Sequence, residues 1–245
     1  MATRQMTGIH HFIFVVGLAL LSFPVVFFQS SWAISNMVLD LPILLILNIL
    51  MMIFFLETES RKFEYKSILL LVLASVAVLS AFLRLIPLPL GFTLSFLLPM
   101  ASAIVFGPVF GFLIGQLSMI VSGLMMGSIG PWLPYQSFLM GMMAFYAGVL
   151  FHKRNSLFFV ILYASVMSLF YGYWISITYW PIAMMQVGHN MNLWEKIISY
   201  QQFYLITSFV WDLTRVAGNI VVFILFYKPT IELLNRAKKR LTYYQ

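Results

Sequence analysis

The sequence predicts an all-α polytopic membrane protein with about eight transmembrane helices. Of its 245 residues, 62% are hydrophobic and only 9% are charged. A soluble domain cannot bury that much apolar surface, so the lipid bilayer must act as the solvent. The apolar segments are also continuous and too long for tilted strands of alternating polarity, which excludes a β-barrel.

Eight apolar segments account for the predicted span count. Charged links separate some of them, and proline starts others because it fits the first turn of a helix. The first segment could be a signal peptide, but it exceeds the usual apolar length of roughly 7–15 residues, which favours a retained helix. The predicted spans are residues 12–28, 39–56, 67–85, 92–106, 109–126, 135–151, 157–180 and 200–227.

The distribution of basic residues predicts the orientation. With a cytoplasmic N-terminus, eleven of the 14 Lys and Arg residues lie in cytoplasmic segments, Arg215 lies inside the last span, and only Arg84 and Lys196 lie outside. This is a strong positive-inside bias, so we expect a multi-pass plasma-membrane protein with both termini in the cytoplasm. The net charge of +7 then reflects topology, and nucleic acid is not expected as a partner.

Residues 92–150 form the centre of the predicted fold. The segment 92–106 is short for a span of about 20 residues, and Pro99 interrupts it. Short, broken segments occur in membranes where protein shields their backbone or where they line a cavity. Glycines in this region, among them Gly111 and Gly115, allow close helix approach.

The loop before residue 137 is a candidate wall of a small-molecule pocket. Two prolines stiffen it, Trp132 and Tyr135 offer flat apolar faces, and Gln136 offers a hydrogen-bond donor and acceptor. The two aromatic residues could equally be interfacial anchors. Trp180 and the segment 181–199, with His189 and Asn190, could complete the mouth of such a pocket.

Four polar residues share one face of the last predicted span, at spacings of four, three and four. Charges within a bilayer are expensive, so they usually face protein or water and form pairs. Three interpretations remain open: a neutralised pair that fixes the last helix, a polar wall or coupling surface, and a proton relay. The residues are Ser208, Asp212, Arg215 and Asn219.

The sequence offers no pattern typical of an enzyme, a metal site or a bound cofactor. Cysteine is absent, and no histidine has a second ligand one helical turn away. The turn around Ser122 lacks the first glycine of an intramembrane serine protease, and no later span carries a histidine. A phosphate-binding loop is also missing, so any active transport must take its energy from a partner or an ion gradient.

Several of these segments together resemble one transporter family. They are residues 96–101 (FLLPMA), 106–118 (FGPVFGFLIGQLS), 130–136 (GPWLPYQ) and 211–219 (WDLTRVAGN), with Gly141, Ala147 and Gly148. The pattern is similar to substrate-binding (S) components of energy-coupling factor transporters, and it covers roughly residues 66–240. It implies a six-helix core over residues 66–228, preceded by two extra helices.

The resemblance also implies a function and partners. An S component captures a vitamin or related micronutrient from outside and associates with a transmembrane coupling subunit and two ATPase subunits. The family's small-residue coupling surface corresponds to Ala77 and Ala81 here. The loop 130–136 looks most like cobalamin-type or unassigned members, and riboflavin or another flat heterocycle remains open.

These expectations divide the chain into four parts and leave two rival functions. The parts are two N-terminal helices (1–57), a charged cytoplasmic link (58–66), the substrate-binding core (67–228) and a basic cytoplasmic tail (229–245). The rivals are a secondary carrier that uses Asp212 and Arg215 as its switch, and a membrane scaffold without a ligand.

Overall fold

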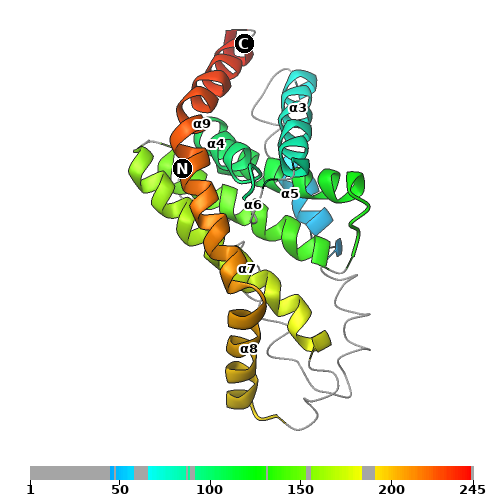
Figure 1. The fold of residues 1–245 in the computed structure, drawn as a ribbon. Coiled ribbons are helices and arrows are strands. Elements are labelled where there is room, and N and C mark those ends of the chain that lie inside the picture. Colours follow the sequence, from blue (N-terminus) through cyan, green and yellow to red (C-terminus); the bar gives the residue numbers. More distant parts are fainter. Residues whose placement is uncertain are drawn as a thin grey trace, which may run out of the picture.

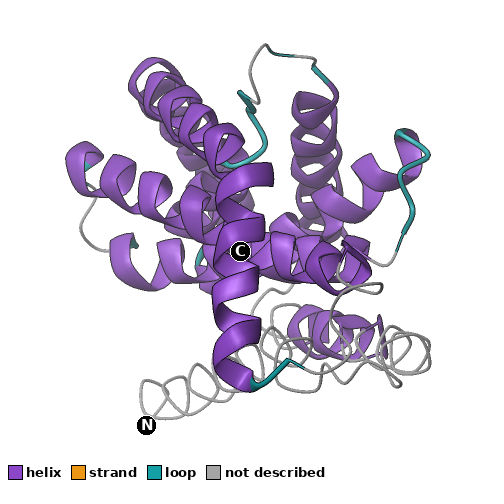
Figure 2. Cartoon of the chain, turned by 60° about the horizontal axis from the view of Figure 1, so that its bottom comes forward, coloured by secondary structure: helices purple, strands orange, loops and turns teal. Residues whose placement is uncertain are grey.

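The computed structural model describes residues 45–46, 48–57, 66–86, 88, 92–130, 132–152, 156–183 and 191–243. These residues form helices and loops without a strand, which confirms the all-α class for this part of the chain (Figure 1, Figure 2). The predicted span 12–28 lies outside the described residues. A short helix, Asn48–Glu57, precedes the others. The other helices are α3 (Lys66–Leu85), α4 (Leu97–Phe106), α5 (Pro108–Met125), α6 (Trp132–Phe151), α7 (Leu157–Ala183), α8 (Leu193–Thr207) and α9 (Phe209–Tyr243).

Four of the described helices are long and apolar enough to cross a membrane. These four helices are α3, α5, α7 and α9. Large apolar side chains lie exposed on their outer faces, including Leu71 of α3, Phe158 of α7 and Leu225 of α9. Exposed apolar faces of this kind suit contact with lipid. A helical membrane protein is therefore supported, and the total of eight spans stays a prediction.

Helix α4 lies in the centre of the bundle and is too short to be a span. Its ten residues rise about 15 Å, roughly half the hydrocarbon thickness. Every residue from Leu97 to Val105 is buried, and α4 packs against α5, α6 and α9. The predicted span 92–106 is thus a buried half-length helix whose backbone is shielded by protein.

The carboxyl end of α4 receives donors from its cap residue and from two distant parts of the chain. The Gly107 amide donates to Ala103 O at 3.0 Å, and the His152 Nδ1 lies 2.7 Å from Ile104 O. Lys238 Nζ donates to Val105 O at 2.6 Å. The His152 and Lys238 contacts supply carbonyls that the helix end leaves without an intrahelical partner, and the Lys238 cation also complements the helix dipole.

Small residues set the spacing of α4, α5 and α6. A Cβ added at Gly115 would lie 2.7 Å from Met140 O, so α5 and α6 touch through their backbones there. A Cβ at Gly111 would lie 2.2 Å from the Ala103 Cβ of α4. This is the close approach that the glycine-rich segment predicts, with the partner of each glycine now assigned.

The last third of the chain differs from the predicted helices. A single span over 200–227 is wrong: the helix breaks at Ser208, between α8 and α9. Helix α8 begins at a capping box in which Asn192 and Glu195 bond each other's backbone amides, inside the predicted loop 181–199. Helix α9 continues through Pro229 to Tyr243, so the described part of the basic tail is helical.

Candidate functional site

A polar cluster joins three helices at the C-terminal end of α3. Arg84, in the last turn of α3, donates from Nη1 to Ser122 Oγ of α5 at 2.7 Å. Its Nη2 donates to Gln136 Oε1 of α6 at 3.1 Å. The guanidinium is half-buried and turned toward the neighbouring helices. Both acceptors are neutral, so they orient the cation without cancelling its charge.

A second arginine lies beside Tyr171, a buried tyrosine of α7. The Arg215 guanidinium is 5.6 Å from the centre of the Tyr171 ring, a cation–π distance. The charges of Arg84, Arg215 and Asp212 all act on the Tyr171 hydroxyl. This places the ends of α3, the middle of α7 and the start of α9 around one region, with two cations and one anion.

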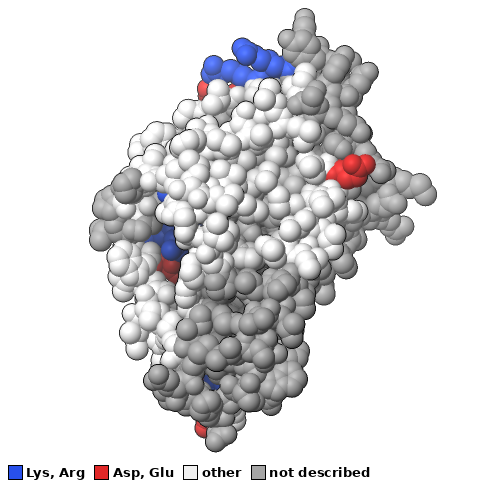
Figure 3. Space-filling view, turned by 90° about the vertical axis from the view of Figure 1, so that its right-hand side faces the viewer, with Lys and Arg blue, Asp and Glu red and all other residues white. Residues whose placement is uncertain are grey.

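Figure 3 shows where charged side chains lie on one face of the molecule. Most of the described surface in this view is uncharged, basic atoms gather at the top end, and an acidic group lies at the right-hand edge. A smaller group of basic and acidic atoms lies in a hollow at mid-height, away from both ends. A recessed charged group in an apolar surface is the arrangement expected of a polar site inside a membrane protein.

Aromatic side chains line the same region. Trp132 at the start of α6 stacks on Tyr179 of α7, with ring centres 5.7 Å apart and planes 22° apart. Gly130 makes room for this indole, because a Cβ there would lie 2.4 Å from the Trp132 ring. Phe96 meets Tyr171 edge-on at 5.5 Å. Flat faces beside a guanidinium suit a small ligand with a ring and a polar group.

The polar face of the last span packs against α7 and forms what we call the α7–α9 seam. Its contacts run antiparallel along the two helices. Ser208 Oγ accepts from Ser176 Oγ at 2.8 Å, and Asn219 Nδ2 donates to Ser168 Oγ at 2.6 Å. Between them, the Asp212 carboxylate lies against Gly172, where an added Cβ would be 1.8 Å from its Oδ2.

Asp212 is the most enclosed charge of the α7–α9 seam. Arg215 Nη1 lies 2.5 Å from its Oδ1, and the Tyr204 hydroxyl of α8 donates to its Oδ2 at 3.0 Å. The Asp212 side chain is 2% exposed and that of Arg215 22%. Because the carboxylate accepts from Tyr204 of α8 and lies against Gly172 of α7, the geometry favours the interpretation in which the pair fixes the last helix.

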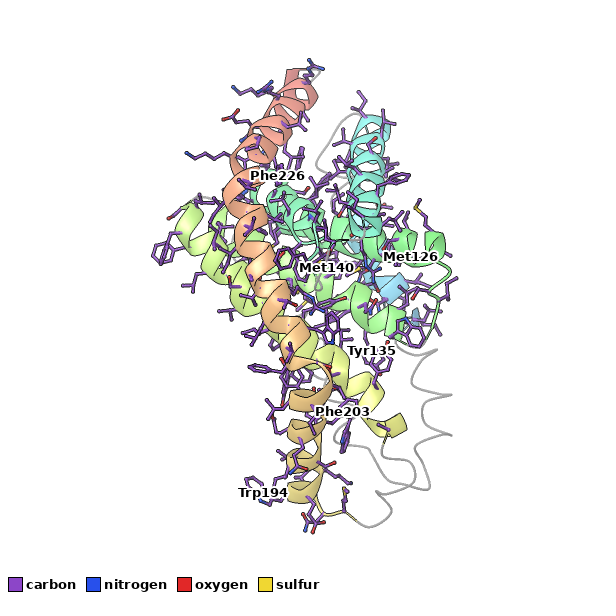
Figure 4. All side chains as sticks on the ribbon, viewed as in Figure 1. Met126, Tyr135, Met140, Trp194, Phe203 and Phe226 are labelled. Carbon is purple, nitrogen blue, oxygen red and sulfur yellow. The ribbon has the colours of Figure 1, made fainter. Side chains whose placement is uncertain are left out.

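The structure separates the residues predicted to bind substrate. Trp132 and Gln136 lie in the site described above, in contact with Tyr179 and Arg84. Tyr135 is 9% exposed and belongs to the main core, and Figure 4 shows it below the central Met140. Trp180 is fully buried and packs edge-on against Tyr200, with its Nε1 3.3 Å from Ser199 Oγ.

The remaining predicted residues do not reach this site. His189 and Asn190 lie outside the described residues. Ala77 and Ala81 are 2% and 0% exposed, and Ala77 belongs to the core between α3 and α5. In this conformation the outer face of α3 carries Leu71, Leu79 and Phe82 instead. The alanine contact with a coupling subunit stays a prediction.

Four residues of the site were not among those predicted from the sequence: Arg84, Ser122, Tyr171 and Tyr179. Arg84 carried a signal, because it is one of two basic residues on the unfavoured side of the membrane. The two tyrosines are eight residues apart and so share a helix face, but many aromatic residues in α7 do. Nothing in the sequence around Ser122 indicated that it would belong to this site.

No cluster of three or more acidic or histidine ligands occurs within the described part of the chain. The region around Tyr171 contains two cations, the Asp212 carboxylate, neutral hydrogen-bonding groups and aromatic rings. Comparison of the chain with protein-family models, with curated proteins and with solved structures found no match.

Proposed function

We propose that this protein is a membrane receptor for a small molecule, acting as the substrate-binding component of an energy-coupling factor transporter for a vitamin or related micronutrient. One observation carries the proposal. A half-buried arginine, oriented by Ser122 and Gln136, lies near the stacked Trp132–Tyr179 pair where α3, α5, α6 and α7 meet. Convergent polar groups beside aromatic faces at a helix-bundle mouth are typical of ligand sites.

The sequence resemblance supports the same function and supplies the partners. We propose a transmembrane coupling subunit and two ATPase subunits, because the chain has no phosphate-binding loop of its own. In this proposal the site opens to the outside and both termini lie in the cytoplasm, as the basic residues indicate. The carrier alternative is less well supported, since Asp212 is held by Arg215 and Tyr204 within the seam.

Capture of a vitamin should raise the melting temperature of the detergent-purified protein. A ligand at about 100 times its dissociation constant stabilises the folded state by roughly 2.7 kcal/mol. The probes are cobalamin, riboflavin, thiamine, biotin, folate and pantothenate. We expect one of them to shift the melting temperature, and Trp132→Ala to abolish that shift because the ring stacks in the site.

Trp194→Ala is the matched control for this experiment. Trp194 is 69% exposed at the far end of α8, where Figure 4 shows it away from the α3–α6 region. Its replacement should leave the ligand-induced shift unchanged. A folded protein that no probe stabilises would contradict vitamin capture and favour the scaffold alternative.

A further inference from the structure

Within the described part of the chain, Arg84 is explained neither by topology nor by pairing with an acidic side chain. It is one of two basic residues that the orientation places outside, against the general bias. None of the acidic side chains that the structure describes pairs with it: Asp212 contacts Arg215, and Glu232 contacts Arg236. The three charged groups around Tyr171 therefore sum to a net positive charge.

The direction of the Arg84 side chain excludes two simple explanations. An arginine at the end of a span usually extends its charged head toward water. Here the guanidinium turns inward and donates to Ser122 and Gln136 on two other helices. The dipole of the α3 carboxyl end favours a cation, but this effect is small and does not require inward orientation.

A cation that neutral acceptors hold in a fixed orientation is positioned to bind an anion. Withdrawing a charge from water is costly unless an opposite charge compensates it. The two hydrogen bonds fix the plane of the guanidinium and leave its other N–H groups available, and this planar fork matches the two oxygens of a carboxylate or a phosphate. The compensating charge then belongs to the ligand.

We infer that Arg84 binds the anionic group of the transported molecule, and that the substrate is a small organic acid, a carboxylate or phosphate ester, with a flat portion against Trp132 and Tyr179. This inference rests on the proposed function and narrows it. Among vitamin-like solutes, it favours acids over neutral or cationic compounds. An anionic lipid headgroup has the same chemistry and is the competing source of the charge.

Pairs of acids and neutral analogues test the inference on the full chain in neutral detergent. The probes are biotin and its amide, nicotinate and nicotinamide, and pyridoxal phosphate and pyridoxal. We expect one acid to bind about 10- to 100-fold more tightly than its neutral partner, the range expected of a charged hydrogen bond. Arg84→Gln should remove this preference, and Arg84→Lys should keep part of it.

Arg236→Gln is the matched control, because it removes the same charge at an exposed position of α9. Arg236→Gln should leave the affinity for the acid and the affinity for its neutral analogue unchanged. A ligand that binds its acid and neutral forms equally in wild type and in Arg84→Gln would support capture and overturn the anion assignment. Equal stabilisation by phosphatidylglycerol, with none by the acids, would assign the charge to lipid and also overturn it.

A second variant tests the uncompensated charge without any ligand. Gln136→Glu places a carboxylate where an amide oxygen now lies 3.1 Å from Arg84 Nη2. The new ion pair should raise the melting temperature of the ligand-free protein by about 2–4 °C and weaken binding of the acid. Gln202→Glu, at an exposed position of α8, should change neither the melting temperature nor the binding of the acid. A lower melting temperature for Gln136→Glu would show that Arg84 is already neutralised, which overturns the inference even if no probe binds.

Discussion

Replacing Arg215 by methionine should lower the free energy of unfolding by about 3–5 kcal/mol, the cost of removing one partner from a buried ion pair. The substitution leaves the Asp212 carboxylate, 2% exposed, with the Tyr204 hydroxyl as its remaining polar contact outside its own helix. Methionine keeps an unbranched apolar side chain at this position, so the loss reports mainly on the charge. The measurement is an unfolding titration of purified protein in mixed micelles.

Two further variants complete the experiment. Asp212→Asn should cost less than Arg215→Met, because the Arg215 side chain is 22% exposed and can turn toward water. The double variant, Asp212→Asn with Arg215→Met, should be more stable than Arg215→Met alone, since no buried charge remains. If the two single losses simply add in the double variant, Asp212 and Arg215 do not act as a pair in the α7–α9 seam.

Gly148→Val should be strongly destabilising, because it overpacks a tight contact between helices in the core. A Cβ at Gly148 would lie 2.7 Å from the Pro108 Cα and 2.9 Å from Ala103 O, and both are backbone atoms that cannot move aside. Overpacking costs about 1–3 kcal/mol and occasionally more. We expect the upper end of this range, because α4, α5 and α6 meet at this point.

Ala217→Val is the control for this prediction. It adds two methyl groups at an exposed position of α9, where lipid can accommodate them. Its melting temperature should match that of the wild type, whereas Gly148→Val should melt several degrees lower. Equal melting temperatures for the two variants would mean that the contact of α6 with Pro108 and Ala103 is looser than the structure has it.

The sequence alone was informative where the membrane imposes strong rules. Continuous apolar segments predicted a helical membrane protein, and the described residues are helical, with four helices apolar enough to cross a membrane. The length of the segment 92–106 and its proline marked α4 as unusual, and it is a buried helix of ten residues. These features follow from the thickness of the bilayer and from backbone hydrogen bonding, which act on each segment separately.

Helix boundaries in the last third were harder to predict. Apolar residues on both sides of Ser208 hide the break, because hydropathy reports burial in lipid and not the local backbone direction. The start of α8 did carry a signal, since Asn192 followed by Glu195 is the pattern of a capping box. The segment around it is polar enough to pass for a loop.

Periodicity placed Ser208, Asp212, Arg215 and Asn219 on one face, but it could not say what lies opposite. Only the tertiary structure places Ser176, Gly172 and Ser168 of α7 there, some 30 to 50 residues away in the chain. The same limit applies to Arg84, whose partners belong to α5 and α6. Local sequence determines which residues share a helix face, whereas the packing of helices decides whether that face meets lipid, another helix or a ligand.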